Sequence, residues 1–259
     1  MHWLAVTEAQ VPAGTAWLSP VEAARAAGMR FTKRRSEYRL RRYAGKRAVS
    51  AQLRWDLDEG SLAAVEVLNR PGGAPYAVVA GADLGLDISL TDRAGAAVCL
   101  VGPAGTMGHG TLGVDLEIVE PRSAGFVADY LTASEQVWVR EGGPVGSIGW
   151  DVRANLLWSA KESALKVLRV GLRADTRWVQ VQVSTELRPD GWAPLQVQLV
   201  EPGHAASGEV FPGWWRRDGA YLLTLAARHT AEPPALLAGG ADLAHARPAH
   251  SWLTQPLAE

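Results

Sequence analysis

The chain has 259 residues, of which 47% are hydrophobic and 20% charged, so it is able to bury a sizeable core. Its formal net charge of -1 gives the whole molecule no attraction for nucleic acid or an anionic membrane. Cys99 is the only cysteine, which excludes an internal disulfide and a thiolate-rich metal site. No stretch approaches the ~20 apolar residues that span a bilayer, and residues 1–14 lack a signal-peptide pattern, so we expect a cytoplasmic protein.

The N-terminal part predicts a short helix and then a long basic one. Ser19-Pro20-Val21-Glu22 is a capping box with proline at the first helical position, and Gly28 ends that helix. Residues 33–53 contain no proline and predict a second helix, whose cations face a single acid, Glu37, and suggest a phosphate or acidic-partner surface. A solvated charged face is the alternative. The cations are Lys33, Arg34, Arg35, Arg39, Arg41, Arg42, Lys46 and Arg47.

The middle of the chain predicts two strands separated by a loop. Residues 96–101 form an apolar strand candidate, and 103–110 read as a loop. Residues 112–118 alternate in polarity like a half-buried strand, which points Asp115 and Glu117 the same way. We therefore divide the chain into an N-terminal subdomain (1–110), a C-terminal subdomain (111–230) and a peripheral tail rich in Ala, Pro and Gly (231–259).

The C-terminal part predicts one amphipathic helix followed by antiparallel strands. Asp151 and Gly171 are the expected ends of the helix. The strands are expected at 178–184, 195–200 and 221–227. Residues 43–48 and 158–163 place an aromatic residue, a lysine and small residues in the same order, which suggests two related subdomains or two helices that look alike.

Three carboxylates in this region could bind a hard cation. Asp115 and Glu117 can present oxygens to one ion, and Glu162 would complete a set suited to Mg²⁺. Taken alone, the first two fit solvent-exposed acids equally well, and Glu162 with Lys166 fits a surface ion pair. Trp158 and Leu165 share that helix face, which favours the wall of a cleft, where lysines could neutralise phosphate charge.

Gly113-Val114-Asp115-Leu116-Glu117 and Trp158-Ser159-Ala160-Lys161-Glu162-Ser163-Ala164-Leu165-Lys166, in this order, resemble the paired signature of Sfp-type 4′-phosphopantetheinyl transferases. The likeness covers about residues 15–228. It implies an α+β fold, with a pseudo-twofold pair of subdomains and mostly antiparallel sheets, and a site between them. It also implies transfer of phosphopantetheine from coenzyme A to a serine of an acyl or peptidyl carrier protein, releasing 3′,5′-ADP, and we expect a monomer.

The same resemblance implies roles for individual residues. Asp115, Glu117 and Glu162 would hold Mg²⁺, Lys166 would face the reacting phosphate, and Glu162 would accept the serine proton. Ser89-Leu90-Thr91 resembles the family's coenzyme A-binding turn, and residues 214–215 with Tyr221 resemble its closing strands. The remaining residues expected to bind coenzyme A or the partner are Arg34, Arg35, Arg42, Lys46, Asp92 and Lys161.

Two departures from the family pattern affect the expected activity. Asp92 stands where the family's phosphate-binding histidine is expected, so it would repel a phosphate unless it turns away or a cation covers it. Arg41 stands where glycine is usual and could compensate for Asp92. Two alternatives therefore stay open: a degenerate member that binds carrier protein or coenzyme A without transfer, and an enzyme of other chemistry in the same cleft. The sequence does not identify the carrier protein or its pathway.

Overall fold

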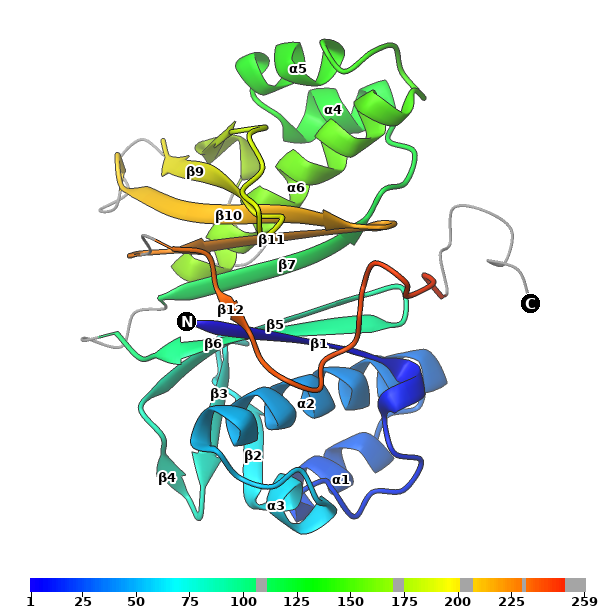
Figure 1. Ribbon diagram of the computed structural model, residues 1–259, viewed down its shortest axis with the longest axis vertical. Coiled ribbons are helices and arrows are strands. Elements are labelled where there is room, and N and C mark those ends of the chain that lie inside the picture. The colour runs from blue at the N-terminus through cyan, green and yellow to red at the C-terminus, as the bar shows by residue number, and fades with distance from the viewer. Residues whose placement is uncertain (106–110, 170–174, 201–206, 230–231, 250–259) are drawn as a thin grey trace.

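The computed structural model describes residues 1–105, 111–169, 175–200, 207–229 and 232–249. Two halves stack on each other, each with one long helix and antiparallel strands, which confirms the α+β class (Figure 1). Among the described residues, none of the helices has the length and apolar character needed to cross a membrane.

The N-terminal half splits its strands between two sheets. Three of its strands join the late strand β12 (Ala235–Leu236) in the order β12-β1-β6-β5, and the others form the sheet β2-β3-β4. Its elements are β1 (His2–Thr7), α1 (Pro20–Ala27), α2 (Thr32–Leu53), α3 (Glu59–Ala64), β2 (Val65–Asn69), β3 (Pro75–Val79), β4 (Ala82–Asp83), β5 (Leu86–Arg93) and β6 (Ala96–Pro103).

The C-terminal half has one sheet in the order β7-β11-β10-β9-β8, in which every pair of neighbours is antiparallel. Its elements are β7 (Leu112–Ile118), α4 (Ala124–Tyr130), α5 (Ala133–Arg140), α6 (Ile148–Leu168), the 3₁₀ turn Thr176–Trp178, β8 (Val179–Val183), β9 (Ala193–Leu199), β10 (Val210–Asp218) and β11 (Tyr221–Ala227).

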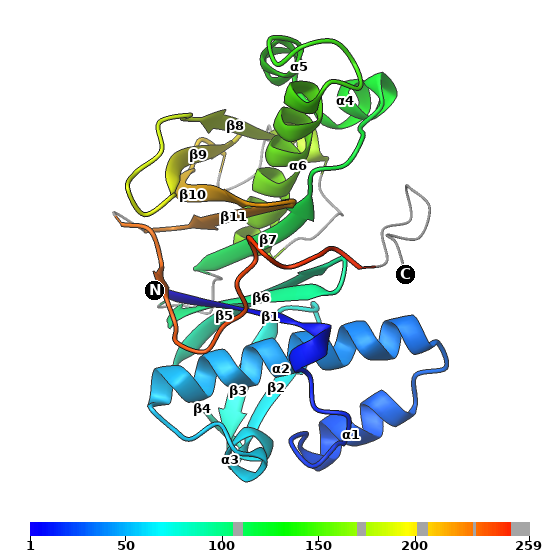
Figure 2. The same ribbon diagram turned by 45° about the vertical axis from the view of Figure 1, so that its right-hand side comes forward.

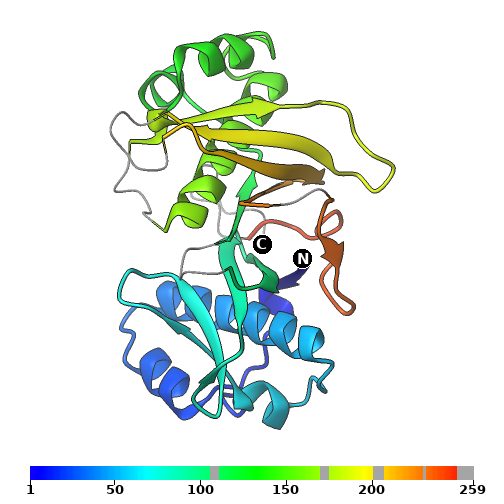
Figure 3. The ribbon, with the colours of Figure 1, turned by 90° about the vertical axis from the view of Figure 1, so that its left-hand side faces the viewer.

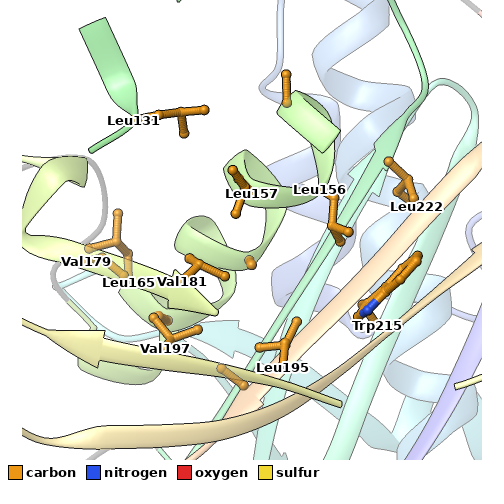
Figure 4. Packing of buried hydrophobic residues seen from close by; sticks show 14 of the residues in the cluster. Leu131, Leu156, Leu157, Leu165, Val179, Val181, Leu195, Val197, Trp215 and Leu222 are labelled. Carbon is orange, nitrogen blue, oxygen red and sulfur yellow. The ribbon is translucent and has the colours of Figure 1, made fainter. Parts of the chain in front are cut away.

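The halves form four layers, with α2 under one sheet and α6 over the other (Figure 3). An apolar core that includes Trp3, Leu100, Leu116 and Leu225 fills the space between the sheets. A second core lies between α6 and its sheet, where Leu157, Val181 and Leu195 are among the residues in Figure 4. Burial of the apolar cluster between the sheets holds the two subdomains against each other.

Side chains of β5 supply the polar contacts between the two halves. Three alternate residues of β5 accept backbone N–H groups of β7: Asp87 Oδ2 from Leu112 at 3.1 Å, Ser89 Oγ from Val114 at 3.0 Å and Thr91 Oγ1 from Leu116 at 3.2 Å. The buried amides of β7 on this side are thus satisfied by side chains instead of by another strand.

Most expected elements appear where the sequence places them. Residues 96–101 and 112–118 are strands, Ser19 caps α1 with Glu22, and α2 begins at Thr32. The predicted start of α6 was wrong: Ser147 is its N-cap and accepts a hydrogen bond from Trp150 N, so the cap lies four residues before the expected cap, Asp151. Gly171 lies outside the described residues.

The repeat suggested by the two lysines appears as the same buried ion pair in both halves. Lys46 Nζ contacts Glu22 at 2.5 Å and donates to the carbonyl oxygens of Leu62 and Val65. Lys161 Nζ contacts Glu135 at 2.8 Å and donates to the carbonyl oxygens of Thr176 and Val179. Each ammonium therefore has three partners, which equals its number of donors.

The glutamate of each pair also belongs to a capping box. Glu22 accepts from Ser19 N and Val67 N, and Glu135 accepts from Thr132 N and Val181 N. One carboxylate thus joins the start of a short helix, a strand and the lysine of the long helix. The matching contacts support two related subdomains.

The last described residues lie along both halves and do not form a loose tail (Figure 2). β12 pairs with β1, Ala241 N donates to Ala5 O at 2.7 Å, and Leu243 is buried in the core between the sheets. Arg47 also donates to Gly239 O at 2.7 Å. The expectation of a peripheral tail is therefore wrong for residues 235–243, because an edge strand and a core position hold them.

We predict that Lys161→Met destabilises the fold by about 3 to 5 kcal/mol, because it leaves Glu135 as an uncompensated buried charge. Urea unfolding followed by circular dichroism measures the change. Lys33→Met is the control, since the Lys33–Glu37 pair is exposed and should contribute less than about 1 kcal/mol. Equal unfolding midpoints for Lys161→Met and the wild type would contradict a structural role for the buried pair.

Candidate active site

Asp115 and Glu117 lie on β7 and point the same way, as the alternating sequence predicts. They do not face solvent: β7 is buried along its whole length, and the two residues are 6% and 9% exposed. β5 and α6 cover this part of the strand. The close approach of α6 requires glycine at position 113, because a side chain there would collide with the backbone oxygen of Ser163.

Asp115 is held by side chains from both halves. Its Oδ1 accepts from Lys166 Nζ at 2.8 Å and from Thr91 Oγ1 at 3.2 Å. Its Oδ2 accepts from Ser159 Oγ at 2.9 Å. The expected catalytic lysine and the expected metal-binding aspartate thus form an ion pair.

Glu117 belongs to a ring of alternating charges. Its Oε2 lies 3.1 Å from Arg93 Nε and 3.6 Å from Arg122 Nη2, and both arginines also contact Glu120, at 2.5 and 3.3 Å. Trp158 Nε1 donates to Glu117 Oε1 at 3.2 Å. Glu117 is therefore fixed beside Trp158 and two cations that no motif in the sequence had singled out.

Two carboxylates of the site have raised pKa values. Burial first, and then the charge of Asp115, raise the pKa of Glu162 to about 7, while Lys166 acts in the opposite direction. The same two causes raise the pKa of Glu117 to about 7 against Arg93 and Arg122. Within the described residues, Glu162 Oε1 and Glu117 Oε2 are buried oxygens without a hydrogen-bond partner.

The described residues contain no set of three or more His, Cys, Asp or Glu side chains arranged to hold a metal ion. Asp115 is paired with Lys166, and Glu117 with Arg93 and Arg122, which explains why the three expected ligands do not converge. The donor set nevertheless fits a hard divalent cation in its chemistry: all the donors are carboxylate oxygens, and the buried Glu162 Oε1 has no hydrogen-bond partner among the described residues.

A groove leads to Lys166 from an arginine-lined cavity of about 650 Å³. That cavity and a second one share Gly73, Pro75 and Leu90 in their walls, so they adjoin under the β2–β3 turn. The second cavity is lined by Lys166, Arg169, Ser89 and Asp87, among others. The arginines of the first cavity are Arg25, Arg41, Arg42 and Arg70.

Sequence reasoning missed much of this groove. Arg25 and Arg70 were not expected there, because they come from α1 and the end of β2, far from the motifs. The sequence Pro71-Gly72-Gly73 indicates a turn, and a cation directly before that turn, Arg70, was the one signal for a basic residue in this part of the groove. The position of Arg70 beside α2 depends on how the sheet β2-β3-β4 packs against the helix, and local sequence patterns do not predict that packing.

The predicted cations of α2 and α6 have different environments. Arg42 lies in the groove wall, stacked on Tyr38 with its guanidinium 4.6 Å from the ring centre. Arg34 is exposed and Arg35 partly buried near the start of α2, and neither lines the groove. The cations of α2 therefore do not form the one-sided surface that the sequence suggested.

Lys46 and Lys161 must be removed from the predicted ligand-binding set. Both side chains have 0% exposure, and all three donors of each ammonium are engaged by Glu22 or Glu135 and by backbone carbonyls. A ligand has no access to them in this structure. Burial also lowers the pKa of both lysines, against the effect of their glutamates.

Ser89 and Thr91 lie within strand β5 and not in a turn, which corrects the sequence expectation. Their hydroxyls bond to β7, although Ser89 also reaches the wall of the second cavity. Asp92 lies in a separate hollow with Lys33 and Glu37 and forms an ion pair with Arg41. A cation thus covers the charge of Asp92, one of the outcomes that the sequence left open.

One protein-family model matches the part of the chain that contains β7 and α6. Residues 111–207 match the model of the 4′-phosphopantetheinyl transferase superfamily. The similar solved structures include holo-[acyl-carrier-protein] synthase of Helicobacter pylori in complex with coenzyme A, with 18% identity and a TM-score of 0.32. That likeness covers 40% of this chain and 98% of the other. No curated protein matches the sequence.

We predict that Glu162→Gln stabilises the metal-free protein at pH 8 by about 1 to 3 kcal/mol. The ordinary glutamate pKa is 4.5, whereas that of Glu162 in the folded protein is about 7. Between these values the unfolded chain gives up the proton and the folded protein keeps it, so stability falls as pH rises.

Thermal unfolding in EDTA at pH 4.5 and pH 8 measures this difference. The unfolding temperatures of the wild type and Glu162→Gln should differ more at pH 8 than at pH 4.5. In separate scans without EDTA, a divalent cation should raise the unfolding temperature of the wild type more than that of the variant. If the unfolding temperatures of both proteins changed equally with pH, folding would not raise the pKa of Glu162.

Proposed function

We propose that this chain, a member of the 4′-phosphopantetheinyl transferase superfamily through residues 111–207, moves phosphopantetheine from coenzyme A to a carrier-protein serine. The observation that carries the proposal is the arginine-lined groove that ends at Lys166, which is ion-paired with Asp115. Such a groove suits a long ligand with several phosphates, and coenzyme A is of that kind. The Sfp-type assignment within the superfamily is part of this proposal.

Asp115, Glu117 and Glu162 are the residues that would hold Mg²⁺. When bound there, the ion would offset the negative charge of the pyrophosphate. Lys166 would have to exchange its contact with Asp115 for one with the phosphate, which its partly exposed position on α6 allows. Arg41 and Arg42 would bind phosphate at the other end of the groove.

Glu162 is the proposed acceptor of the serine proton. Burial beside Asp115 raises the pKa of Glu162 to about 7 in the metal-free protein, and a bound cation would lower it. The base role therefore follows the family resemblance and the position of Glu162 beside Asp115, and not this pKa. The serine oxygen forms a bond to the β-phosphorus of coenzyme A, and the bond between that phosphorus and the bridging oxygen breaks. The products are the phosphopantetheinyl serine and 3′,5′-ADP.

The non-catalytic alternative depended mainly on Asp92. Because Asp92 is ion-paired with Arg41 and lies outside the groove wall, it does not present an unpaired negative charge to a ligand there. The remaining acidic and basic residues suit transfer. Cytoplasmic location, a monomeric state and a role in polyketide or nonribosomal peptide synthesis remain proposals that follow the resemblance alone.

We predict that Asp115→Ala and Glu162→Ala each slow transfer about 100-fold or more, because each removes a carboxylate that holds the cation at the reacting phosphate. The assay combines the protein, coenzyme A, Mg²⁺ and apo carrier proteins, and mass spectrometry detects the added phosphopantetheine. Glu186→Ala, an exposed acid between β8 and β9, is the control. Unchanged transfer by Glu162→Ala would exclude Glu162 as both ligand and base.

We predict that Arg41→Gln raises the dissociation constant for coenzyme A about 10-fold at low salt, because a charged hydrogen bond to phosphate contributes about 1.5 to 3 kcal/mol. Calorimetric titration measures it. Arg34→Gln changes the same charge on the same helix but lies outside the groove wall, so its effect should stay within about twofold. Equal losses for both variants would mean that only the overall charge of α2 matters.

A further inference from the structure

A chain of buried hydroxyl groups runs behind Asp115. Ser159 Oγ lies 2.9 Å from Asp115 Oδ2 and 2.8 Å from Thr224 Oγ1. Thr224 Oγ1 lies 2.8 Å from Ser163 Oγ, which also lies 3.1 Å from Thr224 O. All three hydroxyl residues have 0% exposure. Thr224 is on β11 directly opposite Asp115 on β7, while the two serines come from α6.

The negative charge of Asp115 fixes the direction of the two bonds that link Thr224 to Ser159 and Ser159 to Asp115. A carboxylate only accepts hydrogen bonds, so Ser159 uses its one proton to donate to Asp115. Ser159 must then accept from Thr224, whose proton is used in turn. Thr224 has then no proton left for Ser163, whose own single proton goes either to Thr224 O at 3.1 Å or to Thr224 Oγ1 at 2.8 Å. The protons of Ser159 and Thr224 both point toward Asp115, and bonds aligned in this way strengthen one another.

We propose that Thr224, acting through Ser159, is a positioning residue that orients Asp115 for binding a divalent cation. A carboxylate has about four acceptor positions. Lys166 and Thr91 use two on Oδ1, and Ser159 uses one on Oδ2, so the remaining position on Oδ2 has a direction set by Ser159. This inference rests on the proposed function only for the identity of the cation site.

The location of these hydroxyls supports a role beyond packing. Thr224 carries a hydroxyl in the middle of the fully buried strand β11, between Leu223 and Leu225. A buried hydroxyl is costly unless it is hydrogen-bonded, and here its bonds lead to one charged group of the site. Partners that orient a metal ligand typically change metal affinity about 10- to 100-fold when removed.

The test uses two variants of nearly equal shape. Thr224→Val keeps the size of the side chain but removes the hydroxyl, whereas Thr224→Ser keeps the hydroxyl. Calorimetric titration of the whole protein with Mn²⁺ should show about 10-fold weaker binding for Thr224→Val and a change within about twofold for Thr224→Ser. Should Thr224→Val not fold, the comparison of Thr224→Ala with Thr224→Ser decides the same question.

A double-mutant cycle separates positioning from general packing. Once Ser159→Ala has cut the link to Asp115, adding Thr224→Val should weaken Mn²⁺ binding no further. Additive losses, equal affinities for the Val and Ser variants, or no Mn²⁺ binding by the wild type would each overturn the inference. The outcome is independent of transfer: if the wild type binds Mn²⁺ but transfers nothing, the proposed function fails while the affinities still decide the role of Thr224.

Discussion

The buried lysine–glutamate pair is the interaction on which each half of this protein depends. In the C-terminal half, Lys161 joins α6 to α5 through Glu135 and to the chain entering β8 through two carbonyl groups. Because the lysine is fully engaged, it fixes the rotation of α6 about its axis. The next residue, Glu162, and then Lys166 thereby face β7, where Asp115 lies. The geometry of the site is therefore determined by an ion pair on another side of the same helix.

The contact between the halves and the candidate site use the same strand. Thr91 of β5 accepts from the backbone of β7 and donates to Asp115, and Arg93 of β5 pairs with Glu117. Each acid is therefore held partly by the other subdomain. A change that loosens the docking of the two sheets would release both carboxylates from their partners, so stability of the interface and geometry of the site cannot vary independently.

Local sequence patterns predicted most helices and strands. They failed to predict the environments of side chains that depend on packing between segments far apart in the sequence. The alternation around Asp115 and the capping box at Ser19 depend on neighbours in sequence. The structure confirms the strand, the shared direction of Asp115 and Glu117, and the cap, although the strand is buried throughout and not half-buried. Lysine side chains are rarely buried, so Lys46 and Lys161 were predicted to bind coenzyme A or the partner protein. Glu22, the partner of Lys46, already had a complete explanation as part of a capping box. Thr224 gave no signal, because its role depends on pairing with β7.

The path of the C-terminal segment makes the two halves unequal. The repeat of the long helices relates Arg47 of α2 to Glu162 of α6. Gly239 O accepts from Arg47, and Ala241 N donates to Ala5 O, so the C-terminal segment covers Arg47, which occupies the position of Glu162 in the other long helix. A duplicated scaffold would present two equivalent surfaces. Here the chain's own backbone covers one of the two related helix positions, so the two halves of the molecule offer different surfaces to a ligand.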